Sequence, residues 1–248
     1  MSWMNLSTAL AGLAGLGLCF HAWMSARGAG PSDQRRLDAV GAAFLASVWF
    51  LMVPAALVLQ RQGLSAPWLF GAETYDGGVV ETVTGLGLAA SALLAFHQAA
   101  RSSGWLRTVI WGGVGAAALL AFGEETSWGQ HLFHWSSTGV FATANLQAET
   151  NLHNFVSPRL YDVAYALVGW GLIAFAAILS LRPAFFARLK WLPPLPQPSL
   201  VSIALLVSGG ALLQHEVFEE MAEAVVIVAL AFIQARQYLA DRAARSGG

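Results

Sequence analysis

The chain has 248 residues, of which 56% are hydrophobic and only 11% are charged, against roughly one-quarter charged residues in an ordinary soluble domain. Its net charge is -1, so no basic surface is available to neutralise the phosphates of nucleic acid. The single cysteine, Cys19, excludes an intrachain disulfide and a cysteine-based zinc site. This composition is typical of a protein that lies in a lipid bilayer.

Apolar stretches close to the roughly 20 residues that cross a bilayer recur along the chain. A longer tract, 199–240, exceeds one crossing, because about 40 helical residues reach about 60 Å. Its middle, from His215 to Glu223, is too polar for the bilayer centre, so we expect the chain to reverse there. We therefore expect an all-α bundle of about seven transmembrane helices, forming a single domain over residues 1–248. The other five predicted spans are 3–24, 37–60, 79–98, 105–123 and 160–181.

The basic residues predict the orientation of this bundle. Eleven of the thirteen Lys and Arg residues share one side if the odd-numbered helices run inward, and only Arg61 and Arg159 fall on the other. Cytoplasmic loops are rich in Lys and Arg, so we expect an outer N-terminus and a cytoplasmic C-terminus in a bacterial inner membrane. The Pro-rich segment 182–198 is then a stiff cytoplasmic connector, and 123–159 is a loop on the outer side.

Most acidic residues and four of the six histidines fall on the predicted outer side. Acidic residues contribute little to orientation, so the topology alone does not require this asymmetry. We interpret it as a sign of a functional site. The residues concerned are Glu73, Asp76, Glu81, Glu124, Glu125, Glu149, Asp162, Glu216, Glu219, Glu220 and Glu223, with His131, His134, His153 and His215.

Two blocks of polar residues stand out in the outer loop. The first runs from Glu124 to Gln130 as Glu-Glu-Thr-Ser-Trp-Gly-Gln, and the second runs from Asn145 to Asn154 as Asn-Leu-Gln-Ala-Glu-Thr-Asn-Leu-His-Asn. With these blocks the chain resembles a family of uncharacterised bacterial multi-pass membrane proteins that carry both. Relatives often have Arg after the Gln, where this chain has His131. The resemblance implies a multi-pass membrane protein and brings no activity with it.

Two pairs of residues have a spacing that suits metal chelation. Glu149 and His153 are four residues apart, so on a helix they would share one face. His215 and Glu219 repeat this spacing in reverse order. We therefore expect all four to contribute to one metal site.

Other carboxylates could join these residues. Glu125 ends the span 105–123 and Glu81 lies in the first turn of the span 79–98, so both could converge on the same space. Two histidines with four carboxylates form the ligand set of di-iron or di-manganese bundles, whereas a smaller set around zinc would leave a position for water. Glu124, Glu220 or Glu223 could act as general base. We predict Glu125, Glu149, His153, His215 and Glu219 as metal ligands, Glu124 and Glu223 as catalytic residues, and Glu81, His131, His134, Gln130 and Asn154 as further candidates.

Structural interpretations exist for several of these residues. Glu216 and Glu220 could form a solvated elbow between two helices. His131 and His134 flank aromatic residues in a pattern typical of a helix at the membrane interface. The amides of the second block, including Asn154, could hydrogen-bond an irregular backbone that has little access to water.

Two classes of function follow. The first is a membrane-embedded enzyme, either a hydrolase or a di-metal oxidoreductase, which uses zinc, iron or manganese on a lipid or another apolar substrate at the outer face. The alternative is a non-enzymatic membrane subunit that conducts protons or cations, or that docks a membrane or periplasmic partner, because intramembrane ionisable residues also mark ion paths.

Overall fold

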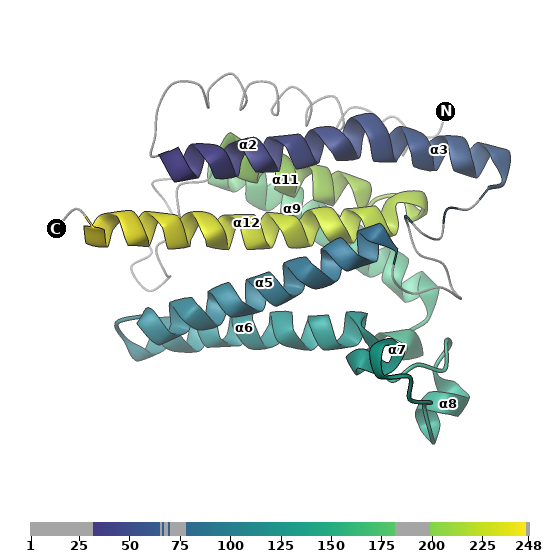
Figure 1. Ribbon diagram of the computed structural model, residues 1–248. Coiled ribbons are helices and arrows are strands. Elements are labelled where there is room, and N and C mark those ends of the chain that lie inside the picture. The colour runs from purple at the N-terminus through teal and green to yellow at the C-terminus, as the bar shows by residue number, and fades with distance from the viewer. Residues whose placement is uncertain (1–31, 65, 67–68, 70–77, 182–198, 247–248) are drawn as a thin grey trace.

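The computed structural model describes residues 32–64, 66, 69, 78–181 and 199–246. Helices joined by turns account for these residues, and no strand occurs among them. The predicted first span at 3–24, the acidic residues Glu73 and Asp76, and the connector 182–198 lie outside the described residues. The main helices in Figure 1 are α2 (Ser32–Ser47), α3 (Val53–Gln62), α5 (Val79–Arg101), α6 (Trp105–Glu125), α9 (Pro158–Leu181), α11 (Leu200–Leu212) and α12 (Glu219–Ser246), with α7 (Gln130–Phe133) and α8 (Val140–Ala144) between α6 and α9.

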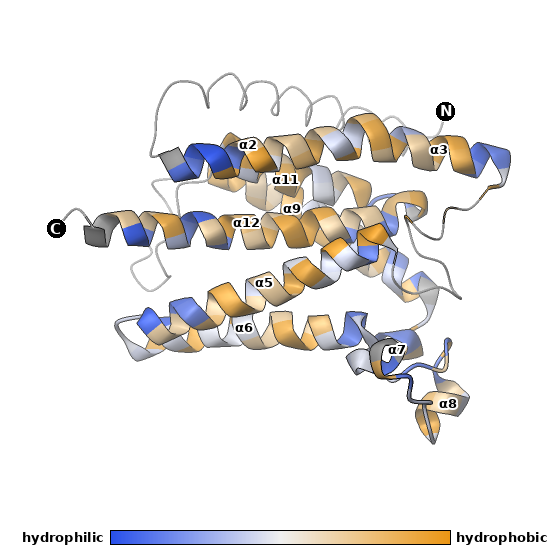
Figure 2. Cartoon of the chain, in the orientation of Figure 1, coloured by the Kyte–Doolittle hydropathy of each residue, from blue (hydrophilic) through white to orange (hydrophobic). Residues whose placement is uncertain are grey.

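Five helices are long and apolar enough to cross a membrane, and apolar residues run along most of their length in Figure 2. The helices predicted at 37–60, 79–98, 105–123 and 160–181 are confirmed. α11 has 13 residues, so it measures about 20 Å, less than the roughly 30 Å of the hydrocarbon layer. The count of seven spans and the orientation stay predictions. The five helices are Asp33–Gln62, Val79–Arg101, Trp105–Glu125, Arg159–Ser180 and Glu219–Ala243.

The first of these spans is one continuous helix of 30 residues that contains a π-helical turn, η1 (Val48–Met52). Pro54 is the second residue of α3, two positions after the end of this turn. Proline has no backbone N–H and its ring crowds the carbonyl four residues earlier, which widens the helix there. The helix ends at Gly63, whose φ of 63° suits the left-handed conformation that often terminates helices.

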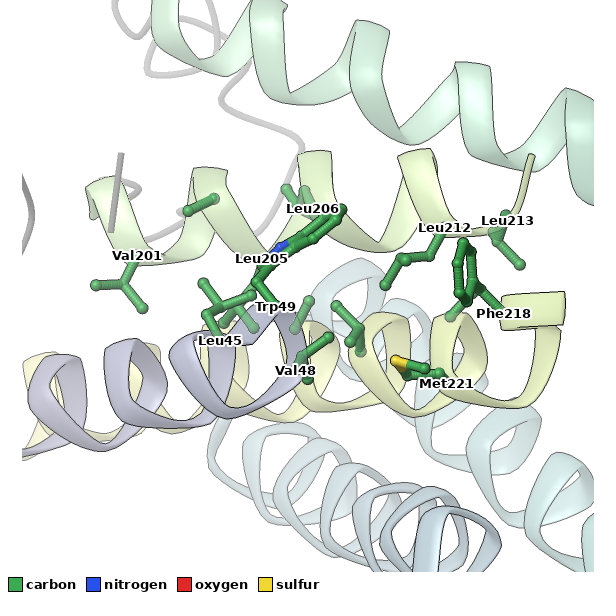
Figure 3. Packing of buried hydrophobic residues seen from close by; sticks show 14 of the residues in the cluster. Leu45, Val48, Trp49, Val201, Leu205, Leu206, Leu212, Leu213, Phe218 and Met221 are labelled. Carbon is green, nitrogen blue, oxygen red and sulfur yellow. The ribbon is translucent and has the colours of Figure 1, made fainter. Parts of the chain in front are cut away.

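The hydrophobic core lies where α2, η1, α11 and α12 meet (Figure 3). Leu45, Leu205 and Leu212 are completely buried, and Met221 of α12 is buried in the same cluster, on the side of Leu212 and Phe218. The indole N–H of Trp49 donates a hydrogen bond of 3.0 Å to the Ser208 hydroxyl, which joins the first span to α11. This bond satisfies two polar groups that would otherwise cost free energy in an apolar environment.

The predicted reversal within 199–240 is confirmed, because the tract forms two separate helices. α11 ends at Leu212, and a turn with the 3-10 helix η4 (Glu216–Phe218) leads into α12. The two helices pack against each other in opposite directions, and α11 also packs against α9 (Figure 1).

The second pair of packed helices is α5 with α6, which a short turn around Gly104 connects. α5 also packs along α12, and both helices run in the same direction (Figure 1). One end of the bundle therefore holds the start of α5, the end of α6 and the starts of α9 and α12. We call it the acidic end because it carries Glu81, Glu125, Glu220 and Glu223; the opposite, basic end carries Arg35, Arg36, Arg101, Arg107 and Arg242.

Candidate functional site

The segment between α6 and α9 is held together by amide side chains at the acidic end. The Asn145 amide N–H₂ donates to the backbone carbonyl of Asn151 at 2.9 Å, and the Asn145 side-chain oxygen accepts from the backbone N–H groups of Gln147 and Glu149. Asn154 donates to the Gln147 side chain at 2.6 Å. These bonds close a tight loop over residues 145–154 that contains no α-helix.

Glu149 lies at the buried centre of this loop. Its side-chain oxygen Oε2 accepts hydrogen bonds of 2.7 Å from the Ser127 hydroxyl and 2.7 Å from the Asn151 amide, and a longer one of 3.4 Å from Asn154. Ser127 and Asn151 are each only 1% exposed. Glu149 thus connects the two polar blocks of the sequence.

Gln130 makes a second connection between the blocks. Its side-chain oxygen accepts from the Thr150 backbone N–H at 2.7 Å, from the Thr150 hydroxyl at 2.8 Å and from the Ser137 hydroxyl at 3.1 Å. His134 directly follows α7 and is exposed, whereas the side chain of His131 lies outside the described part of the chain. Gln130 therefore holds the loop 145–154 against the first polar block.

The same segment holds its backbone in an unusual conformation. Among the described residues, all four non-glycine residues with positive φ lie between positions 127 and 148: Ser127, Trp128, His134 and Ala148. A left-handed conformation is costly for a residue with a Cβ, so the hydrogen bonds around Gln130 and Glu149 must compensate for it.

Glu124 fastens this loop to the end of α6. One side-chain oxygen accepts from the Trp128 indole N–H at 2.9 Å, and the other accepts from the backbone N–H groups of Leu152 at 2.5 Å and His153 at 3.2 Å. The His153 ring nitrogen Nδ1 lies 3.7 Å from the same oxygen. Both oxygens of the predicted catalytic residue Glu124 are therefore occupied by contacts that position the loop.

A cluster of three carboxylates lies beside this loop. Glu125, the last residue of α6, and Glu220 and Glu223, in the first turns of α12, each place an oxygen within 4.8 Å of the others. Among the described residues this is the only group of three or more acidic, His or Cys side chains with potential ligand atoms so close together. We call it the carboxylate triad. Glu220 is exposed, and the other two are partly buried.

Tyrosines from α9 and further carboxylates surround the triad. The Tyr165 hydroxyl donates a short hydrogen bond to Glu223, and the neighbouring Tyr161, whose ring centre lies 5.7 Å away, donates to the backbone carbonyl of His153 at 2.8 Å. Glu81 and Glu219 interact electrostatically with Glu223. Glu81 also accepts from the backbone N–H of Gly78 at 3.1 Å, which caps the start of α5. Four helices thus contribute to this site.

The structure distributes the predicted metal ligands over different places. Glu125 lies in the triad, and Glu219 lies near it. Glu149 and His153 do not share a helix face, because residues 145–152 form a loop and His153 begins a 3-10 turn. The helical spacing that suggested chelation is therefore absent for this pair.

His215 has a comparable local role. Its ring nitrogen Nδ1 accepts from the Val217 backbone N–H at 3.2 Å, and its ring lies 5.2 Å from that of Phe218. It precedes η4, so it shares no continuous α-helix with Glu219, which begins α12. The second predicted chelating pair therefore also lacks the helical geometry behind that prediction.

Tyr165 did not emerge from the sequence as a site residue. One signal could have pointed to it: Tyr161 and Tyr165 are one helical turn apart near the acidic end of an otherwise apolar span, so they share a face. Polar hydroxyls at that depth need partners inside the protein.

No protein-family description, curated protein or solved structure matches this chain in comparisons of its sequence and fold, so the chemistry of the acidic end alone supports a function.

Proposed function

We propose that this protein spans the bacterial inner membrane seven times, with an outer N-terminus, and binds a divalent cation at its outer, acidic end. The observation that carries the proposal is the carboxylate triad of Glu125, Glu220 and Glu223. Three carboxylates with oxygens within 4.8 Å of each other repel one another when all are ionised. A bound cation relieves this repulsion.

The triad has dimensions and chemistry that suit a hard cation. Oxygen ligands lie about 2.0–2.6 Å from Mg²⁺ or Ca²⁺, so two ligands of one ion are at most about 5 Å apart. An all-carboxylate set favours magnesium, calcium or manganese, whereas zinc prefers nitrogen and sulfur. Of the metals expected from the sequence, manganese fits this set best.

Manganese binding to the purified, metal-free protein in detergent tests the proposal. Electron paramagnetic resonance of free Mn²⁺ measures the bound fraction. We expect one saturable site in the wild type, and a loss of affinity on the order of tenfold or more in E125Q and E223Q, since each removes a charged ligand. D162N is the matched control, because Asp162 is an exposed acid on α9 at the same end of the bundle.

Two results would contradict cation binding at the triad. One is a wild-type protein that binds no Mn²⁺, Mg²⁺ or Ca²⁺ at millimolar concentration. The other is a D162N variant that loses as much affinity as E125Q, because a general loss of surface charge would then explain the effect. The orientation is checked separately: a fluorescent protein that folds only in the cytoplasm should fluoresce when fused after Gly248, and a dark fusion would contradict it.

A metal-dependent enzyme is the second candidate, and the surroundings of Glu223 favour it. The Tyr165 hydroxyl beside Glu223 offers a proton next to the site, and the exposed Glu220 leaves one side accessible. The spans that carry Glu125 and Tyr165 expose large apolar side chains, which would face lipid. A lipid of the outer leaflet is the corresponding substrate class.

Proteoliposomes of bacterial phospholipids distinguish the two candidates. An enzyme would release new lipid products in the presence of Mn²⁺, detected by mass spectrometry, and Y165F would reduce their formation while retaining bound Mn²⁺. A wild-type protein that binds Mn²⁺ and forms no product would favour cation binding without catalysis.

A further inference from the structure

A row of buried polar side chains lies between α5 and α12, away from the carboxylate triad. Ser91, Gln98 and Gln234 are 0%, 7% and 1% exposed. With His97 and Gln237 they contribute six buried side-chain atoms that have no hydrogen-bond partner among the residues that the structure describes. These atoms lie within two predicted spans, where lipid offers no partner.

Contacts between the two helices show that most of these side chains belong to one interface. A Cβ atom on Gly87 would lie 2.7 Å from Ile227, and the His97 ring packs edge-on against Tyr238 with centres 5.3 Å apart. Helix periodicity places Ser91 and Gln98 on the same face of α5 as Gly87. It places Gln234 on the same face of α12 as Ile227. The unpartnered groups therefore face one another.

Ser91 differs from other hydroxyl residues of these helices. Thr82 and Thr84 of α5 donate to the backbone carbonyl four residues earlier, at 2.9 Å and 3.2 Å. This local bond is the usual way in which a serine or threonine is satisfied inside a helix. The Ser91 hydroxyl makes no such bond within the described part of the chain, so it is available to a partner between the helices.

The chemical types of the six atoms indicate what that partner is. The amides of Gln98 and Gln234 supply N–H₂ donors, and the side-chain oxygens of Gln234 and Gln237 are acceptors. A metal ion would leave the donors unsatisfied and an anion would leave the acceptors unsatisfied. Water satisfies both, and buried waters commonly bridge such groups.

We infer that α5 and α12 enclose a water-filled polar seam, formed by Ser91, Gln98, Gln234 and Gln237 and entered beside the partly exposed His97 at the basic end. This seam is distinct from cation binding at the carboxylate triad, because it admits water into the membrane-spanning part of the bundle from the basic end. A proton or a small polar solute could enter the bundle along it.

Cysteine accessibility tests the seam directly. Cys19 is the only native cysteine, so a C19A background leaves a single introduced thiol. S91C places a thiol in the seam with little change of volume. A92C is the matched control, because Ala92 is the next residue and is only 3% exposed. The probe is a silver ion, small enough to follow water, and later labelling of the denatured protein with a maleimide dye measures the thiol that remains.

Thiolates form only where water or a charge solvates them, so we expect S91C to react on the order of tenfold faster than A92C. Q234L in the S91C background should remove most of this difference. Equal reaction rates for S91C and A92C would overturn the inference. If S91C does not fold, A231C serves instead, because Ala231 lies one helical turn after Ile227 on the face of α12 that contacts α5. Its control is A229C, because Ala229 is fully buried. Equal reaction rates for A231C and A229C would also overturn the inference.

Discussion

Replacing Glu149 tests whether this residue anchors the loop 145–154 or binds a metal ion. Glu149 accepts two hydrogen bonds of 2.7 Å, from Ser127 and Asn151, in a buried environment. Hydrogen bonds to a charged group contribute about 1.5–3 kcal/mol each, so E149A should lower the free energy of unfolding by roughly 3–6 kcal/mol. E149Q keeps an acceptor oxygen without the charge, and neutral bonds are about half as strong, so we expect about half that loss.

Thermal unfolding in detergent, followed by tryptophan fluorescence, measures the effect of these variants. For a chain of this size 1 kcal/mol corresponds to about 2–4 °C, so E149A should melt at least about 6 °C below the wild type. Exposed acids contribute little, so D162A should melt close to the wild type. An unchanged melting temperature for E149A would refute the anchoring role. An E149A protein that stays stable and loses Mn²⁺ binding would instead identify Glu149 as a ligand.

Three further substitutions test the backbone and the helix contacts by the same unfolding measurement. A148G should stabilise the protein by about 0.5–1 kcal/mol, because Ala148 has a φ of 54° that glycine adopts without strain; destabilisation would contradict this. G169A should lower the stability by about 1–3 kcal/mol, because its Cβ would lie 2.5 Å from a carbonyl oxygen of α11. In the control G171A the new Cβ has no atom within 4 Å, so the stability should be unchanged or higher. Equal changes of stability in the two variants would contradict the close contact at Gly169. The Arg236 guanidinium lies 2.5 Å from the Asp38 carboxylate, so D38A leaves a charge without its partner and should cost about 3 kcal/mol of stability. The double variant D38A/R236M should recover most of this loss. A double variant no more stable than D38A would count against the ion pair.

The helices were readable from the sequence because their signal is local. An apolar run of about 20 residues has one stable arrangement in lipid, which is a helix. The reversal before Glu219 was also readable, since so many charges cannot lie at the bilayer centre. The length of α11 was harder to predict. This 13-residue helix packs against three other helices, so it is as apolar as a helix that crosses the whole membrane.

The candidate site was only partly readable, because it depends on which helix ends meet. Glu125 and Glu223 are far apart in the sequence, and only the packed bundle places them within one cluster. The prediction that Glu149 and His153 share a helix face rested only on their four-residue spacing. The side chain of Asn145, which bonds to three backbone groups of the loop, instead favours a compact loop without helix.

The short helix α11 has a consequence for how the protein enters the membrane during synthesis. At about 20 Å it is shorter than the roughly 30 Å hydrocarbon layer, and most of its residues are buried against α2, α9 and α12. It would therefore gain a stable position only when α12 follows it out of the translocon, so that both enter as a helical hairpin. A nascent chain that ends after Leu212 should leave α11 exposed to quality-control proteases, whereas one that includes α12 should escape them.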